Sequence, residues 1–272
     1  MSKRLYVSDL DGTLLTSNQT LSLKTAEGIN LLREKDIYFS YATARSFITS
    51  QKVTNGINVS LPVIVYNGTF VVDYKSGQIL IGNYFHEEIK EVIKKICDHN
   101  VHPLVYSYID GKEYFSFIRE KLSKGMKEFL NTRLNDPRWR EVDSVEQLLE
   151  GNIFYITCID EKEKLSSLYK QYQNVYHCIY DLDLYSTNQW LEFMPKNVSK
   201  ASAIMQLKEY LKCDEVIVFG DGKNDIEMFE IADFSYVVSN GSDCLKQIAT
   251  GIIESNDEDG VIKKIFELEK IK

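Results

Sequence analysis

The sequence is poor in cysteine, histidine and proline, and the first two shortages exclude whole classes of site. Its 272 residues include 5 cysteines, 4 histidines and 4 prolines. The cysteines lie far apart without a Cys-x-x-Cys pair, so we expect reduced, mostly buried thiols, not a disulfide framework or a zinc site. His99 and His102 are three residues apart, but Pro103 follows directly, and no histidine spacing predicts a metal site.

An excess of basic charge and a long apolar run are also missing. The formal net charge is -8 at pH 7, whereas a general nucleic-acid binder needs a basic surface. No apolar run reaches the length of a membrane span, and residues 2–4 (Ser-Lys-Arg) lead into a predicted strand without a signal-peptide pattern. We therefore expect a cytoplasmic protein that binds neither nucleic acid nor a membrane. A small anionic substrate, which needs only a few local cations, fits this charge.

A short strand-forming run near the amino terminus ends in two carboxylates. Residues 5–8 (Leu-Tyr-Val-Ser) are followed by Asp9 and Asp11, and then by Gly12 and Thr13. In open α/β sheets, ligands bind at the carboxyl ends of the strands. Residues two apart on a strand point the same way, so Asp9 and Asp11 are predicted to flank one small site.

Two acids at this spacing suit phosphoryl transfer. One carboxylate attacks phosphorus while the other gives a proton to the leaving oxygen. Because like charges this close repel each other, a divalent cation is the natural compensator. The residues alone leave a second interpretation open, in which Asp11 caps a turn or helix and Asp9 is a solvated strand end.

The rest of the chain alternates strands and helices, with one interruption. Strands are predicted at residues 37–42, 62–66, 215–219 and 234–238, with amphipathic helices between them, whereas residues 83–188 mix helices with hairpins. The predicted fold class is α/β, with a doubly wound parallel, Rossmann-like core sheet and an inserted α+β cap domain. We expect residues 1–82 and 189–272 to form the core, and residues 83–188 to form the cap.

Polar side chains recur where the predicted core strands end. Thr43 follows the second strand, Asp221 and Asp225 follow the fourth, and Lys200 opens a helix. The carboxyl ends of parallel strands meet at one edge of a sheet, so these residues are predicted to converge with Asp9. Each has a simpler explanation, for example that Thr43 is a helix N-cap and Lys200 a solvated lysine.

These runs resemble the signatures of the haloacid dehalogenase-like hydrolases, and in particular of the Cof-type phosphatases with a large α/β cap. Residues 9–14 (Asp-Leu-Asp-Gly-Thr-Leu) match the first signature without a gap, and residues 220–225 (Gly-Asp-Gly-Lys-Asn-Asp) match the fourth. In the second signature, Ala44 stands where glycine is usual. Lys196 and Lys200 are both candidates for the family's lysine, and Lys200 fits the family spacing better. Residues 257–261 resemble the family's tail, while residues 240–241 match loosely.

The resemblance implies a role for each matching position. Asp9 is the expected nucleophile and Asp11 the expected acid/base. The expected phosphate-binding residues are Leu10, through its backbone N–H, and Thr43, Ala44, Lys200 and Asn224. The expected Mg²⁺ ligands are Asp9, the backbone carbonyl of Asp11, Asp221 and Asp225.

We therefore expect a Mg²⁺-dependent phosphatase that hydrolyses a small phosphorylated metabolite through an aspartyl-phosphate, with a cap that selects the substrate. A sugar phosphate, flavin mononucleotide and pyridoxal phosphate all suit this chemistry, and the sequence does not choose among them. The alternatives are a phosphomutase acting on sugar phosphates, and a non-enzymatic phosphoacceptor or phosphate-ligand sensor. We expect a monomer or a small homo-oligomer.

Overall fold

The fold is described by a computed structural model covering residues 3–182 and 188–271. It divides the chain into two compact units. Unit 1 comprises Met1–Gly82 and Val198–Lys272, and unit 2 comprises Asn83–Asn197. No helix within the described residues is long and apolar enough to cross a membrane.

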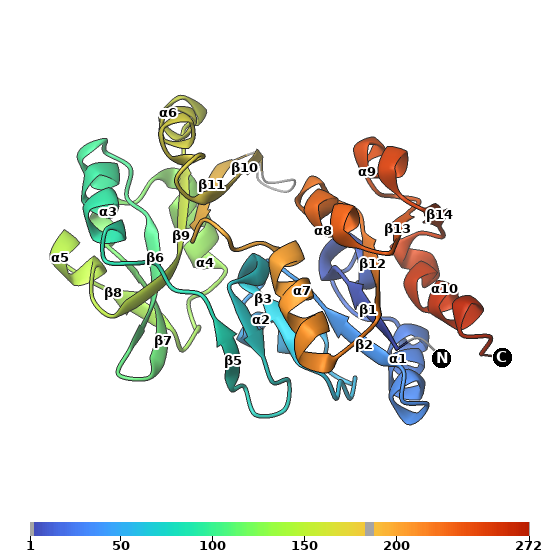
Figure 1. The fold of residues 1–272 in the computed structure, drawn as a ribbon. Helices are drawn as coiled ribbons and strands as arrows, with labels where there is room; N and C mark the ends of the chain where they lie inside the picture. The colour runs from blue at the N-terminus through green and yellow to red at the C-terminus, as the bar shows by residue number, and fades with distance from the viewer. Residues whose placement is uncertain (1–2, 183–187, 272) are drawn as a thin grey trace. The chain divides into compact units, whose positions relative to one another are not determined.

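Unit 1 is built on a five-stranded parallel sheet with the order β14-β13-β12-β1-β2 (Figure 1). The strands are β1 (Arg4–Ser8), β2 (Tyr38–Tyr41), β12 (Glu215–Gly220), β13 (Phe234–Val238) and β14 (Gly251–Ile253). A bridge from Ala42 to Ile64 continues the sheet toward the antiparallel strands β3 (Val63–Val65), β4 (Phe70–Val72) and β5 (Ile79–Gly82). The predicted doubly wound parallel core is confirmed.

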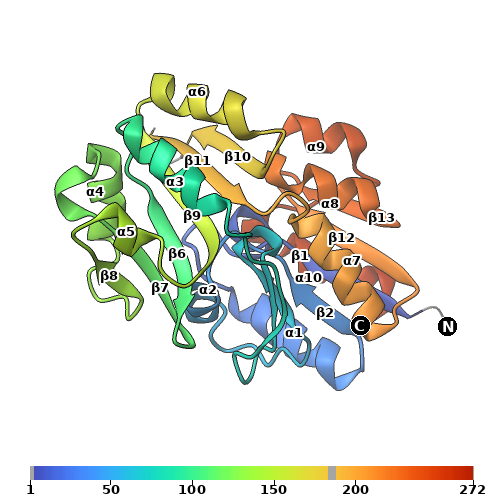
Figure 2. The ribbon, with the colours of Figure 1, turned by 60° about the vertical axis from the view of Figure 1, so that its left-hand side comes forward.

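Helices cover both faces of this sheet. They are α1 (Leu23–Glu34), α2 (Phe47–Val53), α7 (Lys200–Leu211), α8 (Ile226–Ile231), α9 (Asp243–Ile248) and α10 (Gly260–Leu268). Alternate residues of β1, Leu5 and Val7, pack in one apolar core with α7 and α8, and α7 lies in front of the strands in Figure 2. Tyr6 points to the other face, where its hydroxyl donates to Glu269, just after α10. This alternation is typical of parallel strands buried on both faces.

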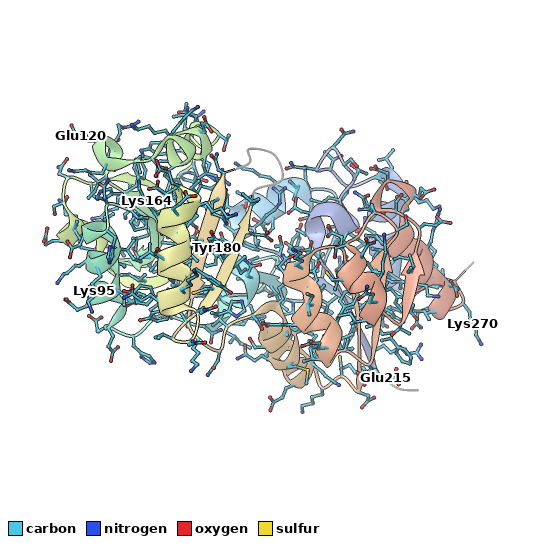
Figure 3. The ribbon with its side chains drawn as sticks, turned by 90° about the horizontal axis from the view of Figure 1, so that it is seen from above. Lys95, Glu120, Lys164, Tyr180, Glu215 and Lys270 are labelled. Carbon is cyan, nitrogen blue, oxygen red and sulfur yellow. The ribbon has the colours of Figure 1, made fainter. Side chains whose placement is uncertain are left out.

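Unit 2 is built on a six-stranded, mostly antiparallel sheet with the order β10-β11-β9-β6-β7-β8. Its strands are β6 (Leu104–Ile109), β7 (Lys112–Phe117), β8 (Trp139–Glu141), β9 (Asn152–Asp160), β10 (His177–Leu182) and β11 (Gln189–Met194). Its helices are α3 (Ile89–Asp98), α4 (Lys124–Asn131), α5 (Val145–Leu148) and α6 (Lys162–Tyr172). On α6, Tyr169 stacks on Tyr180 of β10 with ring centroids 5.0 Å apart, and Tyr180 is labelled in Figure 3. The predicted α+β character of the insertion is confirmed.

One predicted boundary is wrong. Residues 189–197 were expected in the core, but β11 pairs with β9 and β10 and therefore belongs to unit 2. The physical reason is that a strand's own sequence pattern shows that it is half-buried, not which sheet it joins. The sequence analysis also missed α4 and β8, which lie in the charged segment after β7.

Candidate functional site

The two carboxylates of the first signature leave the sheet in different environments. The backbone N–H of Asp9 still donates to the carbonyl of Phe219 on β12, at 2.9 Å, so Asp9 ends the strand in sheet register. A tight turn over Leu10–Leu14 follows, in which Gly12 has a φ of 78°. Asp9 is 6% exposed, whereas the Asp11 side chain is 44% exposed. The Asp9 and Asp11 side chains therefore do not share the one environment that strand geometry predicted, because the strand ends in a turn between them.

A buried lysine joins Asp9 to the fourth signature. Lys200 is the first residue of α7, and its Nζ lies 2.7 Å from Oδ1 of Asp9 and 2.7 Å from Oδ1 of Asp225. Ser199 and Ser202 form a capping box at this helix end, which fixes where the helix begins. Burial alone would lower the pKa of the Lys200 ammonium, but the charges of Asp225 and Asp9 outweigh burial and raise this pKa.

Asp225 also shapes the loop that follows β12. Its Oδ2 accepts hydrogen bonds from the backbone N–H groups of Asp221 and Gly222, at 3.0 and 3.1 Å. Both of its carboxylate oxygens are therefore engaged, one by Lys200 and one by the loop. The side chain is fully buried, so Asp225 ties the Asp221 loop to Lys200.

Asp221 meets the turn of the first signature. Its Oδ1 accepts a hydrogen bond of 2.7 Å from the hydroxyl of Thr13. A Cβ atom at Gly12 would lie only 2.5 Å from Oδ2 of Asp221, so the turn requires glycine for this close approach as well as for its positive φ. Burial, followed by the charge of Asp225, raises the pKa of the Asp221 carboxyl to about 6.

The site holds more negative than positive charge. Carboxylate oxygens of Asp9, Asp221 and Asp225 lie within 4.8 Å of one another, and these three residues form the one such acidic group found in the described part of the chain. Burial raises the pKa of Asp9 well above its ordinary range; Lys200 opposes this shift, and the charges of Asp225, Asp221 and Asp11 add to it. Three carboxylates face one ammonium, and this excess of negative charge suits a hard divalent cation that takes oxygen ligands from Asp9 and Asp221.

The Asp11 carboxylate faces a residue that the sequence analysis did not single out for the site. Arg45 binds it with both arms of its guanidinium, at 2.8 Å from Nε to Oδ2 and 2.6 Å from an Nη to Oδ1. The same Nη donates to the side chain of Gln19 at 2.9 Å. The Asp11 side chain is therefore not part of the group formed by Asp9, Asp221 and Asp225, although Asp11 lies in the turn directly after Asp9. The sequence did contain one indication that Arg45 belongs to the site, because Arg45 directly follows Ala44 in the second signature.

The remaining expected site residues lie on loops of unit 1. Thr43 is fully buried after β2, where its Oγ1 accepts from the N–H of Arg45 at 3.1 Å; Ser46, not Thr43, caps α2. Ala44 and Asn224 are exposed, whereas the side chain of Leu10 is fully buried. Lys196, the competitor of Lys200, is exposed and belongs to unit 2.

Comparisons with known proteins identify the family of this chain. A family model described as haloacid dehalogenase-like hydrolase matches residues 6–265. The chain is 27% identical to the 5-amino-6-(5-phospho-D-ribitylamino)uracil phosphatase YitU of Bacillus subtilis, over 97% of this chain and 98% of that one. It is 26% identical to the stress response protein YhaX of the same species, over 100% and 96% of the two chains.

Solved structures share the whole architecture. TM0651 from Thermotoga maritima superposes with a TM-score of 0.77 at 27% identity, over 100% of this chain and 98% of that one. A haloacid dehalogenase-like hydrolase from Bacteroides thetaiotaomicron gives a TM-score of 0.79 at 23% identity, over 97% and 99%, which supports the fold alone. With the family model matching nearly its full length, this chain belongs to the haloacid dehalogenase-like hydrolases.

Proposed function

We propose that this protein is a Mg²⁺-dependent phosphatase that hydrolyses small organic phosphomonoesters through a phosphorylated Asp9. Its general class follows from the family and from its phosphatase relatives: the chain is a phosphoric monoester hydrolase. The observation that carries the finer proposal is the buried Asp9 carboxylate, which contacts the Lys200 ammonium at 2.7 Å beside two further carboxylates.

The donor set fits a magnesium ion. Asp9 and Asp221, together with the backbone carbonyl of Asp11, would hold it, and Asp225 completes the acidic group. A bound Mg²⁺ would neutralise the excess negative charge and polarise the phosphoryl group. Burial, followed by the charges of neighbouring carboxylates, raises the pKa values of Asp9 and Asp221, and a bound cation would stabilise the ionised forms of both.

Asp9 is positioned to act as the nucleophile. Lys200 binds one of its carboxylate oxygens and leaves the other oxygen to attack phosphorus. In the first step an Asp9 O–P bond forms, the ester P–O bond breaks, and the leaving oxygen takes a proton from the Asp11 carboxyl. In the second step Asp11 takes a proton from water, which attacks the aspartyl-phosphate and releases phosphate and free Asp9.

The Arg45 contact sets a condition on this proton transfer. A carboxylate whose two oxygens both accept N–H groups from a guanidinium has no proton to donate. One of the two contacts must therefore open to free a carboxyl oxygen of Asp11 for the leaving oxygen, while the other contact keeps the carboxyl oriented. Since Asp11 is half-exposed and Arg45 is on a loop, this opening requires no movement of the sheet.

Loops at the carboxyl ends of the unit 1 strands would supply hydrogen-bond donors to the phosphoryl oxygens. We propose that the hydroxyl of Thr43, the N–H groups of Ala44 and Leu10, the Lys200 ammonium and the Asn224 amide supply them. Fixed donors of this kind stabilise the charge of a transferring phosphoryl group.

Substrate choice is the least determined part of the proposal. YitU is named for a phosphorylated ribityl compound, and at 27% identity that compound is one candidate beside a sugar phosphate, flavin mononucleotide and pyridoxal phosphate. We propose that unit 2 selects the leaving group. The phosphate-binding residues of unit 1 would contact only the phosphoryl group, which all phosphomonoesters share.

The test is the release of inorganic phosphate from a panel of these esters, with Mg²⁺ and with EDTA, by the wild type and by Asp9→Asn. We expect turnover that needs both Mg²⁺ and Asp9, and a ranking of esters set by the leaving group. Full activity of folded Asp9→Asn would overturn the proposal. A lasting phosphoryl group on Asp9 without phosphate release would instead indicate a phosphomutase or a phosphoacceptor.

A further inference from the structure

The turn at residues 239–242, between β13 and α9, touches both sides of the acidic site. The side-chain amide of Asn240 donates to the backbone carbonyl of Gly12 at 2.8 Å. Two residues further on, the backbone N–H of Ser242 donates to the backbone carbonyl of Asp221, also at 2.8 Å. One short turn therefore holds the loop of Asp11 and Gly12 and the loop of Asp221 at the same time.

The turn also packs closely against the backbone of Asp221. A Cβ atom at Gly241 would lie 3.1 Å from the Cα of Asp221, and 2.6 Å from the Val237 side chain. The Asp221 carboxylate in turn contacts Thr13, the residue after Gly12. Gly12, Asn240, Ser242, Asp221 and Thr13 thus form a closed ring of hydrogen bonds and chain segments. A closed ring restricts the distance between the two loops that it joins.

A second asparagine holds Asn240 in place. The Oδ1 of Asn240 accepts from the backbone N–H of Asn256 at 3.1 Å. Asn256 is 6% exposed, and its own side-chain amide donates to the carbonyl of Leu15 at 2.9 Å. Because both atoms of the Asn240 amide are used, its Nδ2 is fixed toward Gly12.

We infer that Asn240 is a positioning residue for the metal site. It fixes the turn that carries the Asp11 carbonyl at a set distance from the Asp221 carboxylate. The inference rests on the proposed Mg²⁺ site. Asn240 is not one of the proposed Mg²⁺ ligands, but it controls the geometry of the ligands. Mg²⁺ demands near-ideal octahedral coordination, so a change in the distance between two ligand-bearing loops weakens its binding.

The chain offers a matched control for a merely structural role. Asp257 also joins the carboxyl-terminal segment to the region after the first signature: its carboxylate accepts from the N–H and the hydroxyl of Ser17, at 2.8 and 2.6 Å. This contact is exposed, like that of Asn240, but it lies beyond the turn and touches neither Gly12 nor Asp221. Asp257→Ala therefore removes a similar connection without altering the ring.

The experiment is isothermal titration of Mg²⁺ into the wild type, Asn240→Ala, Asn240→Asp and Asp257→Ala without substrate, with melting temperatures measured in EDTA. We expect Asn240→Ala to weaken Mg²⁺ binding about tenfold, and Asp257→Ala to leave it within twofold of the wild type. The melting temperatures in EDTA should fall by similar amounts in the two alanine variants. That result separates an effect on the metal from an effect on the fold.

Asn240→Asp supplies the sharper comparison. It keeps the acceptor for Asn256 and removes the N–H donated to Gly12, while it adds a negative charge near the site. The inference predicts weaker Mg²⁺ binding in this variant, whereas simple charge attraction predicts tighter binding. Wild-type affinity in Asn240→Ala, or tighter binding in Asn240→Asp, would overturn the inference while leaving the proposed function intact. Absence of Mg²⁺ binding by the wild type would overturn both.

Discussion

Arg45 holds both carboxylate oxygens of Asp11, at 2.8 and 2.6 Å, and this pair connects the second signature to the first. A guanidinium fork matches a carboxylate in one plane, so the contact fixes the orientation of Asp11 as well as its charge. A lysine at the same position would keep the charge but lose the fork. The two effects can therefore be separated by substitution.

Arg45→Lys should lower kcat/KM more for an alkyl phosphate than for p-nitrophenyl phosphate. The alkoxide needs a proton from a correctly oriented Asp11, whereas p-nitrophenolate leaves with little help. We expect a loss of about 10 to 100-fold for the alkyl ester and a several-fold smaller loss for the aryl ester. Steady-state kinetics on both esters measure this ratio. Gln19→Ala, which removes another contact of Arg45, is the control. Equal losses on both esters would contradict the role given to the pair.

Lys200→Met should destabilise unit 1 by about 3 kcal/mol at pH 7, because it leaves two buried carboxylates without their shared counter-charge. Calorimetric unfolding in EDTA measures the loss. Lys208→Met is the matched control on the same helix, since Lys208 makes an exposed 3.5 Å pair with Asp233 that should contribute less than about 1 kcal/mol. A loss at Lys200 no larger than that at Lys208 would show that the cluster does not need the ammonium.

Mg²⁺ affinity should rise with pH between pH 5 and pH 7. The raised pKa of Asp221, about 6, means that this carboxyl is protonated in the metal-free site at lower pH. Mg²⁺ must displace that proton, so each pH unit below 6 should cost about tenfold in apparent affinity. Titrations in buffers of different ionisation enthalpy count the protons released, and we expect at least one at pH 5. An affinity that does not change between pH 5 and 7 would contradict this.

The sequence predicted the core of the site because its residues are tied to strand ends. Asp9, Thr43 and Asp221 all follow core strands, and parallel strands bring such positions to one edge. The roles of these residues stay predictions, but the approach of Asp9 to Asp221 is visible in the structure. Lys200 came from the family spacing, and its burial against Asp9 distinguishes it from the exposed Lys196.

Contacts that depend on how loops fold could not be predicted from the sequence. Nothing in the spacing of Arg45 and Asp11 shows that their side chains pair. Likewise Asn240 lies 228 positions from Gly12, and only the sheet brings them together. The α4 helix was missed although Met126, Phe129 and Leu130 stand at helical spacing, because its 8 residues are fewer than the window over which a helical period is recognised.

Unit 2 contains its own pH-dependent group, Glu192 on β11. Burial raises the pKa of this carboxyl to about 7, although hydrogen bonds with Tyr155 and Thr157 act in the opposite direction. For an acid whose pKa is higher in the folded state, stability is greatest below its unfolded value and falls as pH rises through the folded value. Unit 2 should therefore lose up to about 3 kcal/mol between pH 4.5 and pH 8.

Urea unfolding followed by tryptophan fluorescence measures this loss selectively, because Trp139 and Trp190, the two tryptophans of the sequence, both lie in unit 2. Glu192→Gln keeps the shape and removes the charge, so its stability should vary less with pH and should exceed that of the wild type at pH 8. Glu141→Gln, on the exposed end of β8, is the control and should follow the wild-type profile. If Glu192→Gln and the wild type lose the same stability as the pH rises, the pH dependence arises from another group. Ionisation of Glu192 then destabilises unit 2 very little.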